Sequence, residues 1–227
     1  MDLSVIVDHY PKLLTGAVTT LKLVGLSCLL GAIFALPLAF ARLSAKKWLS
    51  GAAYGYVFFF RGTPLLVQIF LIYYGAAQFV WVRESFLWVV LSKPYWCAII
   101  AFSMNTTAYT SEILRGALQS IPKGEVEACE VLGMRRFKMF QRILLPRAFG
   151  IMLPAYTNEV VLMLKGSALA STITLMDLTG AARTIIARTY TPMEIFISAG
   201  VIYFVLSAMI LFLFHLLEKR TNRFRVA

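Results

Sequence analysis

Long apolar runs alternate with shorter polar segments along the chain, a pattern typical of a protein that crosses a membrane several times. A helix of about 20 consecutive apolar residues spans a bilayer. The pattern predicts five such helices, over residues 15–41, 52–81, 95–115, a stretch within 148–172, and 193–217. We therefore expect an all-α integral membrane protein in which residues 1–227 form a single transmembrane domain.

Two segments depart from a plain series of spans. Residues 3–13 are mildly amphipathic and Pro11 predicts a break, so we expect a short helix that lies along the membrane interface. The second span contains FFFRGTPLLVQ, in which Pro64 removes a backbone donor and Gly62 loosens the chain. We expect a kink or break there, and we expect Arg61 to reach the cytoplasmic interface from the inner end of this span.

Composition supports the membrane assignment. The chain of 227 residues is 59% hydrophobic and 15% charged, whereas soluble domains are about 45–50% apolar and about 25% charged. Its mean hydropathy is +0.76. The net charge of +11 is explained by basic loops that stay in the cytoplasm, so no nucleic-acid partner is expected. The 3 cysteines form no CxxC pair, so the sequence predicts neither a disulfide framework nor a metal site.

Basic residues are divided unequally between the two sets of loops. The loop after the first span, the loop after the third span and the C-terminal tail hold 14 Lys and Arg residues, against 5 on the other side. Cytoplasmic loops carry such an excess, so we expect the N-terminus outside and the C-terminus in the cytoplasm. An aromatic belt is expected at the outer ends of the second and third spans, from Trp81, Trp88, Tyr95 and Trp96.

Residues 120–147, SIPKGEVEACEVLGMRRFKMFQRILLPR, interrupt the apolar pattern with a charged segment far longer than a turn requires. Pro122 suits the first turn of a helix, and Gly133 suits the left-handed residue that ends one. A second helix is expected from about Arg135 to Pro146. Val126, Cys129 and Leu132 recur at three-residue spacing and predict an apolar face on the first helix, and Phe137, Phe140 and Leu144 predict one on the second.

This segment has two interpretations on physical grounds. It is either an amphipathic hairpin that lies on lipid, or a short acidic helix that projects into the cytoplasm and docks in a groove of another protein.

The residues of the segment resemble the EAA loop of the permease subunits of bacterial ABC importers. Glu127-Ala128-Cys129, Gly133 and Ile143-Leu144-Leu145-Pro146 follow that motif, with Cys129 in place of a similarly small alanine. The resemblance implies a type I ABC importer (MetI-like) permease fold with a cytoplasmic loop that couples to an ATPase. The residues that match or flank the motif, and that we expect to serve this coupling, are Glu127, Ala128, Cys129, Leu132, Gly133, Met134 and Arg135.

The likeness extends along nearly the whole chain. FRGTPLLVQ, NTTAYTSEI, IPKGEVEA, LPAYTNEVVLM and STIT resemble the polar amino-acid uptake branch, and more narrowly the M-type permeases for histidine, lysine and arginine or for octopine and nopaline. The resemblance implies a bacterial inner-membrane complex with a second, Q-type permease, two ATP-binding subunits and a soluble periplasmic substrate-binding protein. ATP and Mg would be bound by the partner ATPase, and this chain would bind no cofactor.

Two other classes of function were weighed. A membrane enzyme would need paired catalytic groups, but HExxH and GxSxG are missing, and GxxxxGK[ST] is missing as well. The sequence therefore predicts a subunit without catalysis. A channel or scaffold subunit without ATP coupling is the alternative, although it would not require the acidic helix.

Polar residues inside predicted spans are costly and mark candidate substrate contacts. Glu159 is our main candidate, because a carboxylate in the membrane would neutralise a cationic amino acid. If its helix begins near Ala148, Glu159 lies about 11 residues or ~16 Å in, near the middle of a ~30 Å hydrocarbon core. If the helix begins beyond Pro154, Glu159 lies near its cytoplasmic end instead. The other candidates on the third and fourth spans are Asn105, Tyr109, Asn158, Ser167 and Thr172.

Each candidate also has a structural interpretation. Glu159 would pair with Lys22 or Lys165, and Glu112 with Arg115. Asn105, Tyr109 and the hydroxyl residues would hydrogen-bond between helices.

Overall fold

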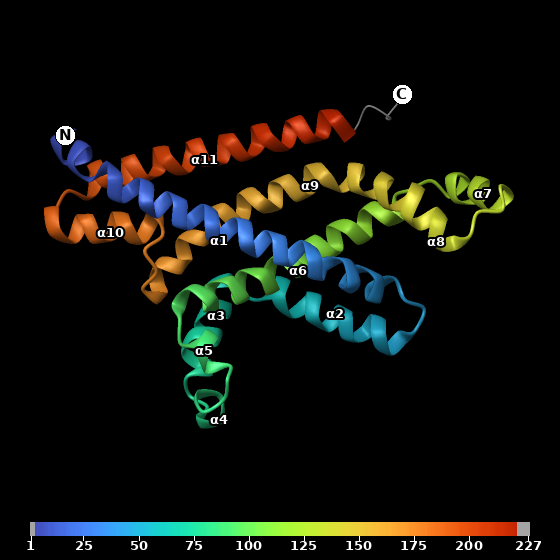
Figure 1. Ribbon diagram of the computed structural model, residues 1–227, viewed down its shortest axis with the longest axis horizontal. Coiled ribbons are helices and arrows are strands. Elements are labelled where there is room, and N and C mark those ends of the chain that lie inside the picture. Colours follow the sequence, from blue (N-terminus) through green and yellow to red (C-terminus); the bar gives the residue numbers. More distant parts are fainter. Residues whose placement is uncertain (1–2, 222–227) are drawn as a thin grey trace.

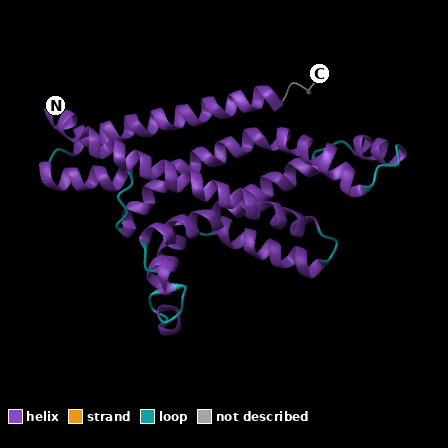
Figure 2. Cartoon of the chain, viewed as in Figure 1, coloured by secondary structure: helices purple, strands orange, loops and turns teal. Residues whose placement is uncertain are grey.

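The computed structural model describes residues 3–221, which form an elongated bundle of helices without a strand (Figures 1 and 2). The five longest runs are α1 (Leu3–Leu43), α2 (Lys47–Gly62), α6 (Pro94–Gln119), α9 (Leu145–Gly166) and α11 (Pro192–Thr221). Shorter helices connect them: α3 (Leu65–Phe70), α4 (Val80–Arg83), α5 (Trp88–Leu91), α7 (Lys123–Val131), α8 (Arg136–Met139) and α10 (Leu178–Thr189). Two π-helical segments, Leu71–Gly75 and Phe140–Leu144, and a 3-10 segment, Ser167–Ile173, extend them.

Helix α6 lies at the centre of the bundle, packed against α1, α2 and α9. Its contact with α1 is close because small residues face each other there, as is typical of helix pairs in membranes. A Cβ atom added at Gly31 of α1 would collide with the methyl group of Thr106 on α6. Ala35 and Ala39, further along α1, are also buried. The core therefore depends on close approach of backbones as well as on large apolar side chains.

The five long runs correspond to the five predicted spans, but they are unequal in hydropathy. By length and composition, α1 and α11 are able to cross a membrane, and the number rises to four if each of two bent helix pairs counts as one span. Helix α6 is long enough, with 26 residues, but it does not qualify on composition. The polar residues Asn105, Thr106 and Ser111 of α6 are buried against neighbouring helices. Because these residues do not face lipid, α6 does not need the mostly apolar composition of a lipid-exposed span.

The prediction of a separate interfacial helix over residues 3–13 is wrong. Helix α1 continues without interruption from Leu3 to Leu43, with Pro11 inside it. Leu13 is fully buried and Val5 packs against the same core. Tertiary contacts on both sides of the proline hold the first turns in line, and they outweigh the single backbone hydrogen bond that Pro11 lacks.

The predicted break in the second span is confirmed. Helix α2 ends at Gly62, and the axis of α3 with its π-helical extension turns by 106°. Thr63 and Pro64 are extended between the two helices. An abrupt change of direction therefore lies in the middle of the predicted span.

Helix α10 was not predicted as a separate element. The buried carboxylate of Asp177 accepts hydrogen bonds from the backbone amides of Thr179 and Gly180, which caps the N-terminus of this helix. The backbone amide of Leu178 donates to the hydroxyl of Thr20 on α1, at 3.1 Å. The helix is therefore fixed to the end of the bundle where the described chain begins (Figure 1).

Candidate functional site

Helices α7 and α8 project from one end of the bundle (Figure 1). Helix α7 ends as predicted at Gly133, whose φ of +69° lies in the left-handed region. The amide of Gly133 donates to the carbonyl of Glu130, and the amide of Met134 donates to the carbonyl of Cys129. This pair of bonds is a Schellman motif, which satisfies the last carbonyls of a helix and depends on a residue that tolerates positive φ.

Three large apolar side chains at this end point outward. Val131 is 88% exposed, Leu132 78% and Phe137 74%. We name these residues the apolar tip. Burying one such side chain is worth about 1.5–3 kcal/mol, so a cluster of them at the end of a bundle indicates a surface that another molecule covers.

The predicted apolar faces are only partly correct. Cys129 is buried at 4% exposure, but Leu132 lies beyond the last turn of α7 as its C-cap and turns outward. Phe137 is likewise exposed, whereas Phe140 packs edge-on against Phe40 of α1 with ring centroids 5.0 Å apart. The spacing in the sequence predicted which residues share a face of a helix, but it did not show where each helix ends.

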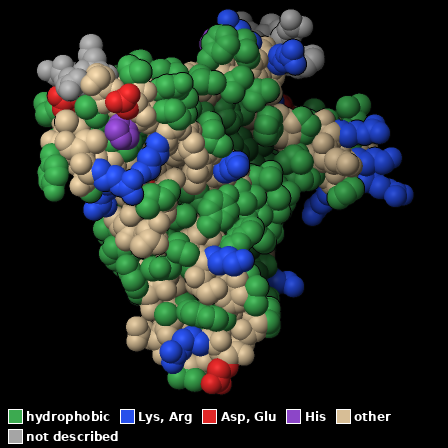
Figure 3. All heavy atoms as spheres, turned by 60° about the vertical axis from the view of Figure 1, so that its left-hand side comes forward, with side chains coloured by type: hydrophobic (Ala, Val, Ile, Leu, Met, Phe, Trp, Pro, Cys, Tyr) green, Lys and Arg blue, Asp and Glu red, His purple; other side chains and the backbone are tan. Residues whose placement is uncertain are grey.

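The residues predicted to couple to an ATPase fall into two groups. Met134 is half-buried and Cys129 is buried, so these two support the bend from within. Exposed residues form the outer surface: Glu127, Ala128, Leu132, Gly133 and Arg135. Lys and Arg side chains gather at this projecting end, in contrast to the largely hydrophobic surface of the bundle (Figure 3).

The projecting end is connected to the bundle by a continuous rod. Helix α8 continues through the π-helical segment into α9, so the second helix of the loop does not end at Pro146 as predicted. The amide of Leu145 bonds to the carbonyl of Phe140, five residues back, and this wider turn makes room for the proline ring just beyond it. Arg147 of α9 forms an ion pair with Glu125 of α7, with 3.2 Å between Nη2 and Oε1.

Glu159 lies inside the bundle on α9 and is only 6% exposed. Because α9 begins at Leu145 and continues through Pro154, Glu159 is about 14 residues or ~21 Å from that end of the helix. No ion pair within 4.0 Å joins it to any residue of 3–221, including the predicted partners Lys22 and Lys165. The hydroxyl of Thr106 lies near its carboxylate, and Arg61 is close enough to influence it electrostatically.

Arg61, which we expected to extend toward the cytoplasmic interface, contacts a neighbouring helix in this structure. It lies in the last turn of α2, about 14 residues or ~21 Å from the start of that helix at Lys47. Its guanidinium carbon lies 5.0 Å from the centroid of the Tyr109 ring on α6. The predicted site residue Tyr109 is therefore brought together with Arg61, a residue that we had interpreted only as an interfacial anchor.

Asn105 stabilises the broken helix, as its structural interpretation predicted. Its side-chain amide donates to the carbonyl of Phe60 at 3.2 Å and to Oε1 of Gln68 at 2.9 Å. The amide of Gln68 in turn donates to the carbonyls of Phe60 and Thr63. These bonds satisfy carbonyl groups that the break leaves without helical partners, a requirement inside a membrane. Gln68, four residues after Pro64, was not recognised from the sequence.

The remaining candidates are not brought to Glu159. Asn158 is exposed, on a different face of α9. The hydroxyls of Ser167 and Thr172 donate to the carbonyls of Leu164 and Leu169 in their own helical segment. Ser167 is eight residues beyond Glu159, a rise of about 12 Å along a helix.

Glu112 forms the ion pair with Arg115 that the structural interpretation predicted, at 2.6 Å between Oε2 and Nη2. Its other oxygen pairs with Nε of Arg42 on α1 at 3.0 Å, a partner that sequence spacing did not suggest. Both arginines therefore hold this carboxylate in a structural role.

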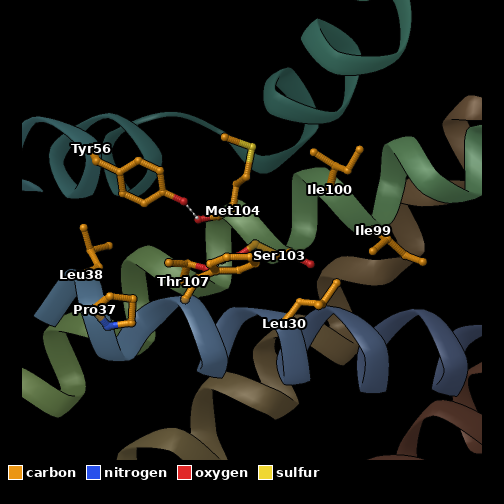
Figure 4. Close-up of a pocket in the computed structure, with 10 residues that line it drawn as sticks. Leu30, Pro37, Leu38, Tyr56, Ile99, Ile100, Ser103, Met104 and Thr107 are labelled. Carbon is orange, nitrogen blue, oxygen red and sulfur yellow. Dashed lines mark hydrogen bonds between the residues drawn. The ribbon is translucent and has the colours of Figure 1, made fainter. Parts of the chain in front are cut away.

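An apolar crevice of about 510 Å³ lies between α1, α2 and α6 (Figure 4). The polar groups at its wall include the phenol of Tyr56, which donates to the carbonyl of Met104 at 2.8 Å. The crevice lacks a charged side chain, and it is lined by Leu30, Phe34, Pro37, Leu38, Tyr56, Ile99, Ile100, Ser103, Met104 and Thr107. It is therefore unsuited to a cationic ligand, in contrast to the surroundings of Glu159.

Comparison with known proteins places the chain among transport proteins. A family model described as "Binding-protein-dependent transport system inner membrane component" matches residues 11–223. The nopaline transport system permease NocM of Agrobacterium fabrum is 49% identical, over 93% of this chain and 90% of its own length. The octopine permease OccM of Rhizobium meliloti is 50% identical, over 93% and 86%. The histidine/lysine/arginine/ornithine permease HisM of Escherichia coli is 42% identical, over 91% and 87%.

Solved structures give the same fold. A chain of an amino acid ABC transporter crystallised with histidines superposes with a TM-score of 0.86 at 34% identity, covering 97% of this chain and 99% of that one. A chain of the inward-facing MetNI methionine ABC transporter superposes with a TM-score of 0.75 at 18% identity, covering 93% and 96%. The second likeness concerns the fold alone, and it agrees with the predicted MetI-like architecture.

Proposed function

The chain belongs to the family of binding-protein-dependent transport system inner membrane components, and we propose that it imports a cationic amino acid or an opine. Members of this family are multi-pass permeases of ABC transporters, and they are not the catalytic subunits. A binding protein and an ATPase are therefore its partners. Histidine, basic amino acids and opines appear in the names of several relatives, which supports the substrate class.

A second, Q-type permease would cover one exposed face of this chain. Asn158 and Lys165 are exposed and seven residues apart on α9, so they share a face. Arg61 is exposed as well, about a third of the way along the predicted span 52–81. Charged side chains within a span are costly where they face hydrocarbon. We infer that these residues face the partner permease and the path between the two subunits.

Orientation follows from the same reasoning. The projecting end with α7 and α8 would lie in the cytoplasm, because Lys and Arg gather there (Figure 3). The start of α1 lies at the opposite end of the bundle (Figure 1). The N-terminus would then be outside and the C-terminus inside.

The projecting end would couple this permease to ATP hydrolysis. Two ATP-binding subunits, which would hold ATP and Mg, would each contact one permease. The exposed apolar tip and the acidic residue Glu127 would enter a groove on the ATPase. Because α8, the π-helical segment and α9 form one rod, movement of the loop would be transmitted to the helix that carries Glu159.

The observation that carries the substrate assignment is the environment of Glu159. A buried carboxylate without an ion-pair partner among the described residues is unfavourable unless a cation joins it. A guanidinium or ammonium group of a substrate would supply that charge. The position of Glu159 within α9, away from both ends, suits a transport site that opens alternately to the two sides.

The test is equilibrium binding of radiolabelled arginine to the purified, assembled complex without its soluble binding protein. Glu159→Gln should weaken binding at least tenfold, which corresponds to about 1.4 kcal/mol, because it removes the charge and nearly preserves the shape. Glu84→Gln is the matched control, since Glu84 is exposed beyond the bundle and should bind as the wild type does. Unchanged arginine binding by Glu159→Gln would remove this residue from the site.

A further inference from the structure

Arg61 joins α2 to α6 through an aromatic ring and not through a carboxylate. Its guanidinium stacks on the ring of Tyr109, with 5.0 Å between Cζ and the ring centroid. It forms no ion pair within 4.0 Å with any residue of 3–221. The side chain is exposed, although it belongs to a helix of the second predicted span, where a charge that faces lipid is costly.

The surroundings of Arg61 contain what a cationic substrate would need. An aromatic face attracts a guanidinium through its quadrupole, and a buried carboxylate attracts it through charge. Tyr109 and Thr106 lie one turn apart on α6, and Thr106 and Glu159 are both buried where α6 packs against α9. The ring that holds Arg61 and the carboxylate of Glu159 therefore border one region between α2, α6 and α9.

We propose, building on the function proposed above, that Arg61 is an internal surrogate for the substrate. In the empty transporter its guanidinium occupies the position that the cationic group of the substrate takes between Tyr109 and Glu159. Arrival of the substrate displaces it, because two like charges beside one carboxylate repel each other.

The position of Arg61 in the chain allows this exchange. It lies in the last turn of α2, directly before Gly62 and the extended residues Thr63 and Pro64. The exposed side of the guanidinium gives it a way out toward the region between the permeases. Asn105 and Gln68 hold the carbonyl of Phe60, so the backbone stays fixed while the side chain moves.

The surrogate has two consequences for transport. While the site is empty it offsets part of the charge of Glu159 from beyond ion-pair distance. It also lowers the apparent affinity for substrate in proportion to the fraction of time that it occupies the site. A weaker site releases its ligand more readily. Neutral amino acids, which do not offset the charge of Glu159, would not displace Arg61.

Removing the surrogate should tighten binding. In the arginine-binding assay described above, Arg61→Gln should lower Kd by about three- to tenfold, because the site no longer excludes substrate part of the time. Arg61→Lys is the matched control, since it keeps the charge and should stay close to wild type. Unchanged or weaker binding by Arg61→Gln would overturn the proposal.

A second test asks whether the substrate uses the same Tyr109 ring as Arg61. It is made in the Arg61→Gln variant, in which Arg61 no longer competes for that ring. Adding Tyr109→Leu should weaken arginine binding about threefold through loss of the cation–π contact, whereas Tyr109→Phe should not. Equal arginine binding by the Tyr109→Leu and Tyr109→Phe double variants would contradict the proposal that the substrate and Arg61 occupy one position. If Glu159→Gln loses binding while Arg61→Gln fails to tighten it, only the surrogate role fails; if Glu159→Gln binds normally, the proposed site fails as well.

Discussion

The centre of the bundle and the projecting loop of residues 120–147 are both built around a glycine, but for opposite reasons. At Gly31 the missing side chain lets α1 approach α6, and an added Cβ would strike Thr106. At Gly133 an added Cβ would meet nothing within 4 Å, yet the backbone needs a positive φ. The first glycine is required by packing and the second by conformation. The comparison teaches that the core is defined by contacts within the chain, whereas the loop is shaped for a surface beyond it.

The largest effect should follow from filling the contact between α1 and α6. Gly31→Val should destabilise the permease by several kcal/mol, because overpacking a close contact displaces backbone. Heating followed by size-exclusion chromatography should show loss of the assembled complex at a lower temperature. Gly25→Val is the matched control on the same helix, since a Cβ there meets nothing within 4 Å. Equal thermal stability of the two variants would mean that close packing does not hold these helices together.

A more selective effect is expected at Gly133. Gly133→Val should leave the complex assembled but reduce ATP-driven uptake at least tenfold, because a β-branched residue disfavours positive φ and would disturb the Schellman motif. Gly133→Asn should keep much more of the uptake, since asparagine tolerates the left-handed region. Uptake and ATP hydrolysis are measured together in proteoliposomes. Normal uptake by Gly133→Val would show that the bend is not required for coupling.

Three prolines show how far local sequence predicts this fold. Pro64 breaks the chain as predicted, and Gln68 and Asn105 satisfy the freed carbonyls. Pro11 and Pro146 were expected to end helices but lie inside continuous ones. Core contacts hold the turns around Pro11, and a π-helical segment makes room for Pro146. Each proline removes one backbone donor from its helix. Contacts with other parts of the structure then decide whether the helix breaks.

The candidate site could likewise be predicted only in part from the sequence. The charged loop and its left-handed glycine follow from local residue types, and Glu159 was evident as a carboxylate within an apolar run. Pairings between separate helices were not evident, including Arg61 with Tyr109 and Arg42 with Glu112. Such pairs depend on how α1, α2 and α6 are arranged, which neither periodicity nor spacing encodes. The outward turn of Leu132 likewise depends on where α7 ends.

In the proposed mechanism, the projecting loop transmits force from an ATPase to the membrane helices. Photo-crosslinking in intact cells tests it most directly, with benzoylphenylalanine in place of Leu132 and, as a control, in place of the exposed Phe86, which lies between α4 and α5, away from α7 and α8. We predict a covalent product of permease and ATP-binding subunit from position 132 and none from position 86. Crosslinks from position 132 to phospholipid alone would contradict the account.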